Sequence, residues 1–103
     1  MTTIHMNWRK LELTAEGHTG SAPAGQDIIC AGISAIITGL GQYLLADEDG
    51  LRPELEIEPG YTTIRARPLI WKWRKAKAAF YQAMLGLELI AEQHAEYVRI
   101  EEE

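Results

Sequence analysis

Residues 27–45, DIICAGISAIITGLGQYLL, combine a helix-starting aspartate with a long apolar helical pattern. Asp27 is a good N-cap, because its carboxylate can accept backbone N–H bonds of the first turn. Apolar side chains then recur three or four positions apart, as on one face of a helix. These side chains are Ile29, Ile33, Ile36, Ile37, Leu40 and Leu44. We therefore predict one helix from Ile28 to about Leu45.

Strands are predicted on both sides of this helix. Apolar and polar residues alternate over residues 3–8 and 10–15, which favours a hairpin that turns near Trp8 to Lys10. After the helix, alternation over residues 54–58 and 61–66 predicts a second hairpin around a Pro-Gly turn. Residues 17–26, rich in Gly, Ser, Ala and Pro, predict a surface loop.

A second helix and a short last strand complete the chain. Pro68 suits a helix start, and a residue stripe at helical spacing follows. The stripe is Leu69, Trp73, Ala76, Phe80, Met84, Leu87 and Ala91. With a final strand at residues 97–100, the order becomes ββαββαβ. This order predicts a single α+β domain over residues 1–103, with two helices on one face of a mainly antiparallel sheet.

The second helix has another apolar line, which faces away from the first: Trp71, Ala78, Leu85 and Leu89. A helix that is apolar on two sides is normally buried on both. This line therefore meets either a second copy of the chain or another element of the same domain. We favour a symmetric homodimer, the commonest form of small oligomer.

Composition excludes several classes of protein. With 47% hydrophobic and 24% charged residues, the chain is ordinarily globular, and we expect no membrane association because no apolar run reaches about 18 residues. The first residues resemble no secretory signal, and one cysteine cannot close an intrachain disulfide, so we expect a cytoplasmic protein.

The net charge of −5 argues against general nucleic-acid binding and makes a basic or neutral partner easier to accommodate. We expect no direct nucleic-acid partner. Residues 71–77, WKWRKAK, nevertheless interleave aromatic and basic side chains, a pattern that can stack bases and contact phosphates. The simpler interpretation is a helix with Trp73 in the core and its lysines in water.

Cys30 and His18 are the candidate catalytic residues. A lone cysteine is commonly an inert buried residue, but Cys30 falls in the first turn of the predicted helix, where unpaired N–H groups favour an anion. Thiolate is the reactive form of cysteine, and a histidine can act as general base and then as general acid. This pair predicts a thiol nucleophile with its base.

Two further residues can support this site. Asp27 is first a helix cap and second an orienting partner for His18, and Ser34 lies four positions after Cys30 on the same helical face. Backbone N–H groups around Ile29 and Cys30 are the natural oxyanion donors. His5, His18 and His94 are scattered and only one cysteine is present, so we predict no metal and no cofactor.

These residues resemble the signature of the ribosomal-processing cysteine protease Prp family. The likeness rests on Gly17-His18, Gly25 and DIICAGISA at residues 27–35, with His18 twelve positions before Cys30. It extends to GLELIAE at residues 86–92 and EYVRI at residues 96–100. Thr19 and Gly32 each stand where the family usually has Ala, and residues 71–75 are outside the family pattern.

The resemblance implies a dimeric cytoplasmic endopeptidase with Cys30 as nucleophile and His18 as base, with Asp27 and Ser34 in the same site. Such an enzyme removes an N-terminal extension from a large-subunit ribosomal protein or processes phage capsid or scaffold proteins. The alternative is a non-catalytic interaction module of the same fold, in which Cys30 is only a core residue.

Overall fold

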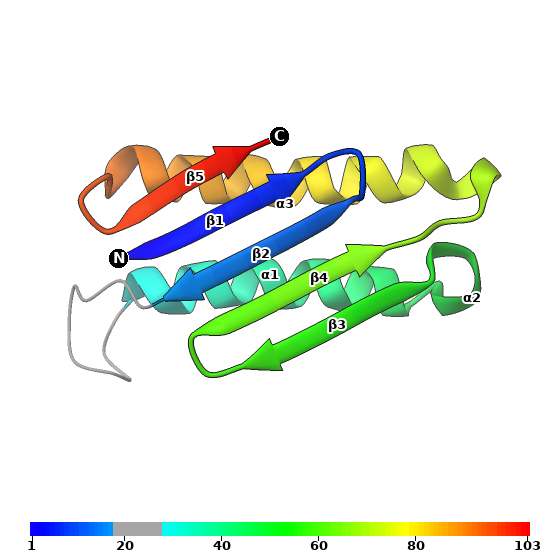
Figure 1. Cartoon of the computed structure of the whole chain (residues 1–103), viewed down its shortest axis with the longest axis horizontal. Helices are drawn as coiled ribbons and strands as arrows, with labels where there is room; N and C mark the ends of the chain where they lie inside the picture. Colours follow the sequence, from blue (N-terminus) through cyan, green and yellow to red (C-terminus); the bar gives the residue numbers. More distant parts are fainter. Residues whose placement is uncertain (18–27) are drawn as a thin grey trace.

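Five strands and two long helices form two layers (Figure 1). The computed structural model describes residues 1–17 and 28–103. The elements are β1 (Thr2–Asn7), β2 (Glu12–Gly17), α1 (Ile28–Leu45), α2 (Glu48–Leu51), β3 (Pro53–Glu58), β4 (Tyr61–Ala66), the 3-10 turn η1 (Ile70–Lys72), α3 (Trp73–Gln93) and β5 (Val98–Glu102). Most of the predicted loop over residues 17–26 lies outside the described residues; Gly17 itself ends β2.

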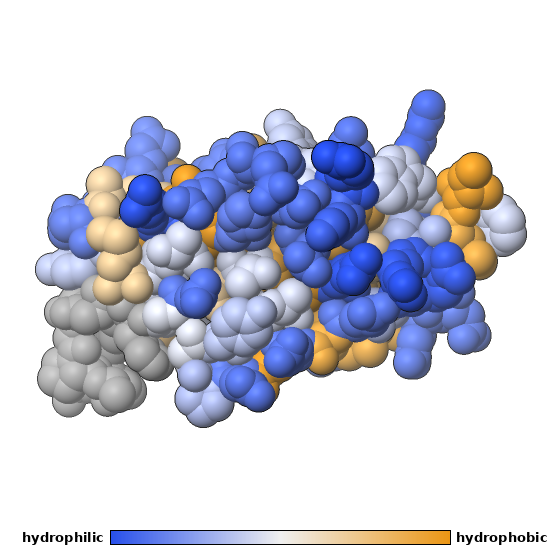
Figure 2. Space-filling model, in the orientation of Figure 1, coloured by the Kyte–Doolittle hydropathy of each residue, from blue (hydrophilic) through white to orange (hydrophobic). Residues whose placement is uncertain are grey.

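The strand order in the sheet is β3-β4-β2-β1-β5. Three neighbouring pairs are antiparallel, whereas β1 and β5 are parallel because α3 carries the chain back across one face of the sheet. The predicted α+β fold, with its ββαββαβ order, is thus confirmed, with a mixed sheet. Both long helices lie on one face (Figure 1), and the other face is mainly hydrophilic (Figure 2).

Helix α1 has the predicted bounds and buries most of its predicted stripe. Its buried large side chains are Ile29, Ile33, Ile37, Leu40 and Leu44. The remaining stripe residue, Ile36, packs against α3, where a Cβ on Gly86 would lie 3.0 Å from the Ile36 Cδ1 atom. Because Gly86 has no side chain, α1 and α3 approach each other closely there, and Ile36 packs in the space between them.

The expectation about apolar runs is wrong for α1 itself. Among the described residues, α1 is the one helix that is long and apolar enough to cross a membrane, with a mean hydropathy of 1.8 over 18 residues. Its buried stripe packs into the core formed with the strands and α3. A helix in the core of a packed domain needs this same apolar composition, so the signal is weak evidence for a membrane span.

The second helix begins later than predicted. Leu69 keeps an extended backbone, with ψ at 150°, and its N–H donates to the carbonyl of Gly50 in α2. This tether holds the chain extended past Pro68, so η1 and then α3 start only at Ile70 and Trp73. As a result Trp73 is 39% exposed, whereas Ala76, Phe80, Met84 and Leu87 are buried as predicted.

The second apolar line of α3 faces solvent. Trp71, Leu85 and Leu89 are 74%, 48% and 55% exposed, and Ala78 is exposed as well. The prediction that this line points away from the first is confirmed. Nothing in the described part of the chain covers this line.

Candidate active site

Cys30 is half-buried in the first turn of α1, at the edge of a cleft of about 470 Å³. The cleft lies between α1 and the β3–β4 hairpin. It forms because the sheet extends past α1, so that the helix-side face of β3 is only partly covered. The sequence predicts a half-buried thiol at a cleft margin, and Cys30 has this position.

One wall of the cleft is a polar line along α1. Cys30, Ser34, Thr38 and Gln42 all line it, each four positions after the last, so they share one side of the helix. Gln42 is twelve positions after Cys30, which at 1.5 Å per position in a helix is about 18 Å. This is the length of roughly five or six residues of extended peptide. The wall is therefore long enough for a stretch of extended peptide.

The opposite wall and the floor are mainly apolar. Leu55 and Ile57 of β3 line the cleft and are 37% and 68% exposed. Ile33, Ile37 and Ile64 close the floor and belong to the core. A cleft with one polar and one apolar wall suits a peptide with apolar side chains, because the polar line can meet its backbone groups.

Thr2 adds a polar atom to the cleft floor. Its side chain is 3% exposed, and its hydroxyl has no hydrogen-bond partner among the described residues. Buried hydroxyls are nearly always paired, so this one is an exception. Sequence reasoning missed Thr2, Thr38 and Gln42; the four-residue spacing from Cys30 could have predicted the last two.

The structure brings two of the four predicted site residues into one cleft, namely Cys30 and Ser34. Ser34 is exposed, one helical turn after Cys30. His18 and Asp27 lie outside the described residues. Gly17, which ends β2, also lines the cleft.

The beginning of α1 has electrostatics suited to anions. The first N–H groups of a helix lack intrahelical acceptors, and the aligned peptide dipoles give this end a partial positive charge. A thiolate at Cys30 and an oxyanion beside it would both be stabilised there. The site can thus support nucleophilic attack on a carbonyl carbon.

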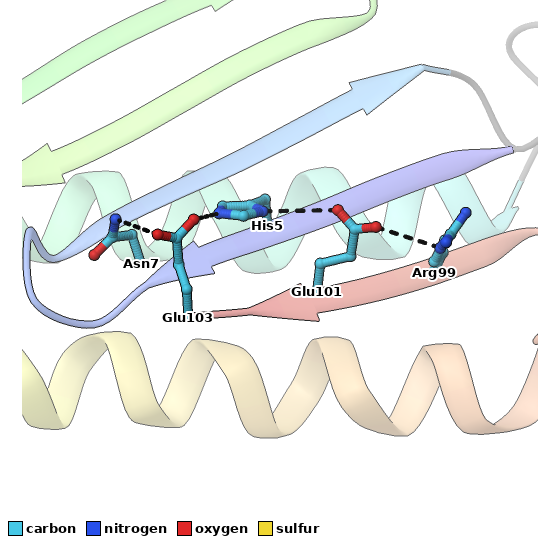
Figure 3. A network of polar contacts seen from close by, with 5 residues as sticks. All are labelled: His5, Asn7, Arg99, Glu101 and Glu103. Carbon is cyan, nitrogen blue, oxygen red and sulfur yellow. Dashed lines mark hydrogen bonds and ion pairs between the residues drawn. The ribbon is translucent and has the colours of Figure 1, made fainter.

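A second group of titratable side chains lies on the open face of the sheet (Figure 3). The His5 Nε2 atom is 2.6 Å from a Glu103 carboxylate oxygen, and its Nδ1 atom is 3.7 Å from Glu101. Asn7 donates to Glu103, and Arg99 pairs with Glu101. These contacts attach β5 to β1 on the face opposite the helices, so they do not belong to the cleft.

A family model described as cysteine protease Prp matches residues 1–99. The chain belongs to the cysteine protease Prp family. This confirms the resemblance drawn from DIICAGISA and the preceding Gly17-His18. A comparison with curated protein sequences gave no match.

Solved structures share the Prp fold. The essential ribosomal processing protease Prp from S. aureus, with a covalently linked product peptide, is 23% identical, with full coverage of both chains (100% each) and a TM-score of 0.86. The same protease with a substrate peptide is 22% identical over 100% of both chains, with a TM-score of 0.81. SMU.848 from Streptococcus mutans is 24% identical over 99% of this chain and 93% of that one, with a TM-score of 0.66. These likenesses establish the fold.

Proposed function

We propose that this chain is a cysteine endopeptidase in which Cys30 is the nucleophile and His18 the general base. The observation that carries the proposal is the position of Cys30, in the first turn of α1 at the edge of the cleft, in a chain of the Prp family. Gly17, the chain neighbour of His18, lines the same cleft and supports the pairing. The cleft is open along α1, which suits cleavage within a chain.

The reaction proceeds by acyl transfer. His18 takes the thiol proton, and the Cys30 sulfur attacks the scissile carbonyl to form a tetrahedral oxyanion. Backbone N–H groups at the start of α1 stabilise this oxyanion. When it collapses, the C–N bond breaks, and His18 gives its proton to the leaving amine. Water then hydrolyses the thioester, with His18 again acting as base.

Asp27 and Ser34 support this dyad. In this proposal the role of Asp27 is to cap α1 and to orient His18. Ser34, exposed on the cleft wall one turn from Cys30, donates a hydrogen bond within the site. Both roles are positioning roles, so their loss slows the reaction less than loss of Cys30.

The proposed substrate is a large-subunit ribosomal protein with an N-terminal extension. The S. aureus relatives are ribosomal processing proteases with bound peptides, and an apolar cleft wall in a chain of net charge −5 suits an apolar segment of a basic protein. A phage capsid or scaffold protein with a similar apolar site is the alternative substrate.

The working form is a cytoplasmic homodimer. An outer groove of about 610 Å³ between α1 and α3 is lined largely by small residues, among them Ala35, Gly39, Ala78 and Gly86. Leu85 and Leu89 are exposed on α3 beside it. Small residues allow close approach of a second copy, and exposed leucines provide the apolar area that a stable interface buries.

The test is cleavage of host ribosomal proteins. Large-subunit proteins are extracted, unfolded, diluted into reducing buffer and incubated with wild type or with Cys30→Ala. New N-termini are identified by mass spectrometry. We expect wild type to produce a new N-terminus after an apolar segment near the start of one protein, and Cys30→Ala to produce none. The same new terminus with Cys30→Ala would overturn the assignment of the nucleophile.

A further inference from the structure

Four exposed basic side chains lie near one end of the molecule, away from Cys30. They are Arg9 and Lys10, in the turn between β1 and β2, and Arg74 and Lys77, near the start of α3. Within residues 1–17 and 28–103, none of the four has an ion-pair partner. By contrast, Lys72 and Lys75 both pair with Asp47. We call Arg9, Lys10, Arg74 and Lys77 the basic edge.

Aromatic contact brings the two segments together. The rings of Trp8 and Tyr81 lie 6.5 Å apart and tilted by 52°, which holds the β1–β2 turn against α3. Arg74, Lys77 and Tyr81 follow one another at spacings of three and four, so they share one side of the helix. Tyr81 is 57% exposed, and Trp71, one turn before Arg74, is 74% exposed. Figure 2 shows hydrophobic side chains exposed at the same end of the molecule.

The charged side chains of α3 are arranged unfavourably with respect to its helix dipole. Its basic residues, Arg74, Lys75 and Lys77, lie near the N-terminus, whereas Glu88 and Glu92 lie near the C-terminus. Helix stability favours the opposite order, with acidic residues in the first turn and basic residues in the last. Asp47 accounts for Lys75, whereas helix stability does not explain Arg74, which an anionic partner would.

The Glu103 side chain does not pair with the basic edge. Trp8 N–H donates to the carbonyl of Glu103, which places a carboxylate residue beside the turn. The Glu103 side chain is held by His5 and Asn7 on the open face of the sheet (Figure 3). Its charge is therefore directed away from α3.

We propose that the basic edge, together with Tyr81 and Trp71, binds single-stranded RNA. Unpaired cations contact phosphates, and exposed aromatic rings stack on bases. An acidic protein partner would use the cations but would not need the rings, so the rings favour RNA. The net charge of −5 argues against general nucleic-acid binding, so the proposal is confined to the basic edge and departs there from the expectation of no nucleic-acid partner. Thr2 lines the cleft and Trp8 begins the turn, about 20 Å away along β1, so RNA and a peptide can be bound at once.

The test is fluorescence anisotropy of the intact protein with labelled oligouridylate, at salt concentrations of about 50 and 200 mM. The variant Arg74→Gln/Lys77→Gln removes two charges of the basic edge. The matched control, Arg67→Gln/Arg99→Gln, removes two exposed arginines that pair with Glu54 and Glu101. Tyr81→Leu keeps an apolar side chain and removes the ring.

We expect wild type to bind, with a salt slope of about −2 to −3, because up to four phosphates are neutralised. The double variant should bind about tenfold more weakly or worse, Tyr81→Leu at least about fivefold more weakly, and the control within about twofold of wild type. No binding, or equal losses in the two double variants, would overturn the proposal. So would preference for polyglutamate or phosphatidylglycerol vesicles over oligouridylate, which would assign the surface to an acidic protein or to a membrane.

Discussion

At the scale of single residues, Asp47 connects the two long helices through charge. Its carboxylate accepts hydrogen bonds from Lys72, at 2.8 Å, and Lys75, at 3.2 Å, just after the end of α1 and at the start of α3. The Lys72 hydrogen bond, followed by that of Lys75, lowers the pKa of Asp47 below its usual value of 3.8. The lysine charges act in the same direction.

Replacing Asp47 with Asn should lower stability in a pH-dependent way. Because the folded-state pKa lies below 3.8, the ion pairs stabilise the folded protein above that pH, and this contribution is lost as pH falls through the folded-state value. Urea unfolding should therefore find Asp47→Asn less stable than wild type near pH 7, with the difference vanishing near about pH 2.

Asp49→Asn is the matched control, since Asp49 makes no ion pair within the described ranges. It should follow wild type at both pH values. A stability loss in Asp47→Asn that is equally large in acid would contradict the role of its charge and indicate a packing defect instead.

At the scale of elements, Gly17 shows how β2 is ended beside the cleft. Its φ is +94°, a conformation that side chains rarely adopt, and a Cβ there would lie 2.4 Å from the carbonyl oxygen of Met1. Its N–H donates to the carbonyl of Gly60 in the β3–β4 turn. Both contacts involve backbone, which cannot rotate out of the way.

Gly17→Ala should therefore destabilise the fold by about 1–3 kcal/mol, the usual range for a strained backbone position. Thermal and urea unfolding measure this change. The control is Gly32→Ala in α1, where the added Cβ would lie 3.4 Å from the Ile90 Cδ1 atom, an ordinary contact, and stability should rise by about 0.5–1 kcal/mol. A Gly17→Ala protein as stable as wild type would show that the end of β2 can rearrange.

The long elements could be predicted from sequence because local pattern and tertiary burial agree in them. The sequence of this region combines a predicted capping residue, Asp27, with a continuous apolar stripe and acidic residues at 47–49, and the bounds predicted for α1 agree with those observed. The β3–β4 hairpin was predicted because alternation and a Pro-Gly turn coincide at residues 53–66. The half-buried position of Cys30 followed from the same helical geometry.

The other features depend on contacts between distant segments. The short α2 was missed, and its C-cap Arg52 has a left-handed backbone, with φ at 46°, where glycine is the usual signal. The late start of α3 comes from the Leu69–Gly50 hydrogen bond, 19 residues apart in sequence. The second wall of the cleft comes from the sheet order, which no local pattern encodes.

At the scale of the whole molecule, the two layers separate three surfaces. The cleft opens where β3 extends past α1, the apolar groove lies outside α1 and α3, and the basic edge lies at the end where β1 turns. The proposed peptide and RNA sites lie at different parts of this fold, and the proposed dimer face is next to the RNA site, since Leu85 is one helical turn after Tyr81.

The proposed homodimer predicts that charge on the outer face of α3 separates the two copies. Leu85→Asp/Leu89→Asp should raise the dimer dissociation constant at least about a hundredfold, because each buried leucine contributes roughly 1.5–3 kcal/mol. Sedimentation velocity measures the change. Ile70→Asp, at a position 86% exposed away from the groove, is the control and should remain dimeric. A wild-type protein that sediments as a monomer would contradict the dimer.

The most direct test of the account is the mass of the protein during turnover. Wild type is mixed with the intact form of the protein that it cleaves, and the reaction is quenched in acid within the first turnover. The enzyme is then analysed as intact protein and as peptides. We expect an added mass equal to that of the N-terminal product less one water, attached to Cys30 as a thioester and removed by hydroxylamine. Substrate cleavage by Cys30→Ala, or an acyl group on another residue, would contradict it.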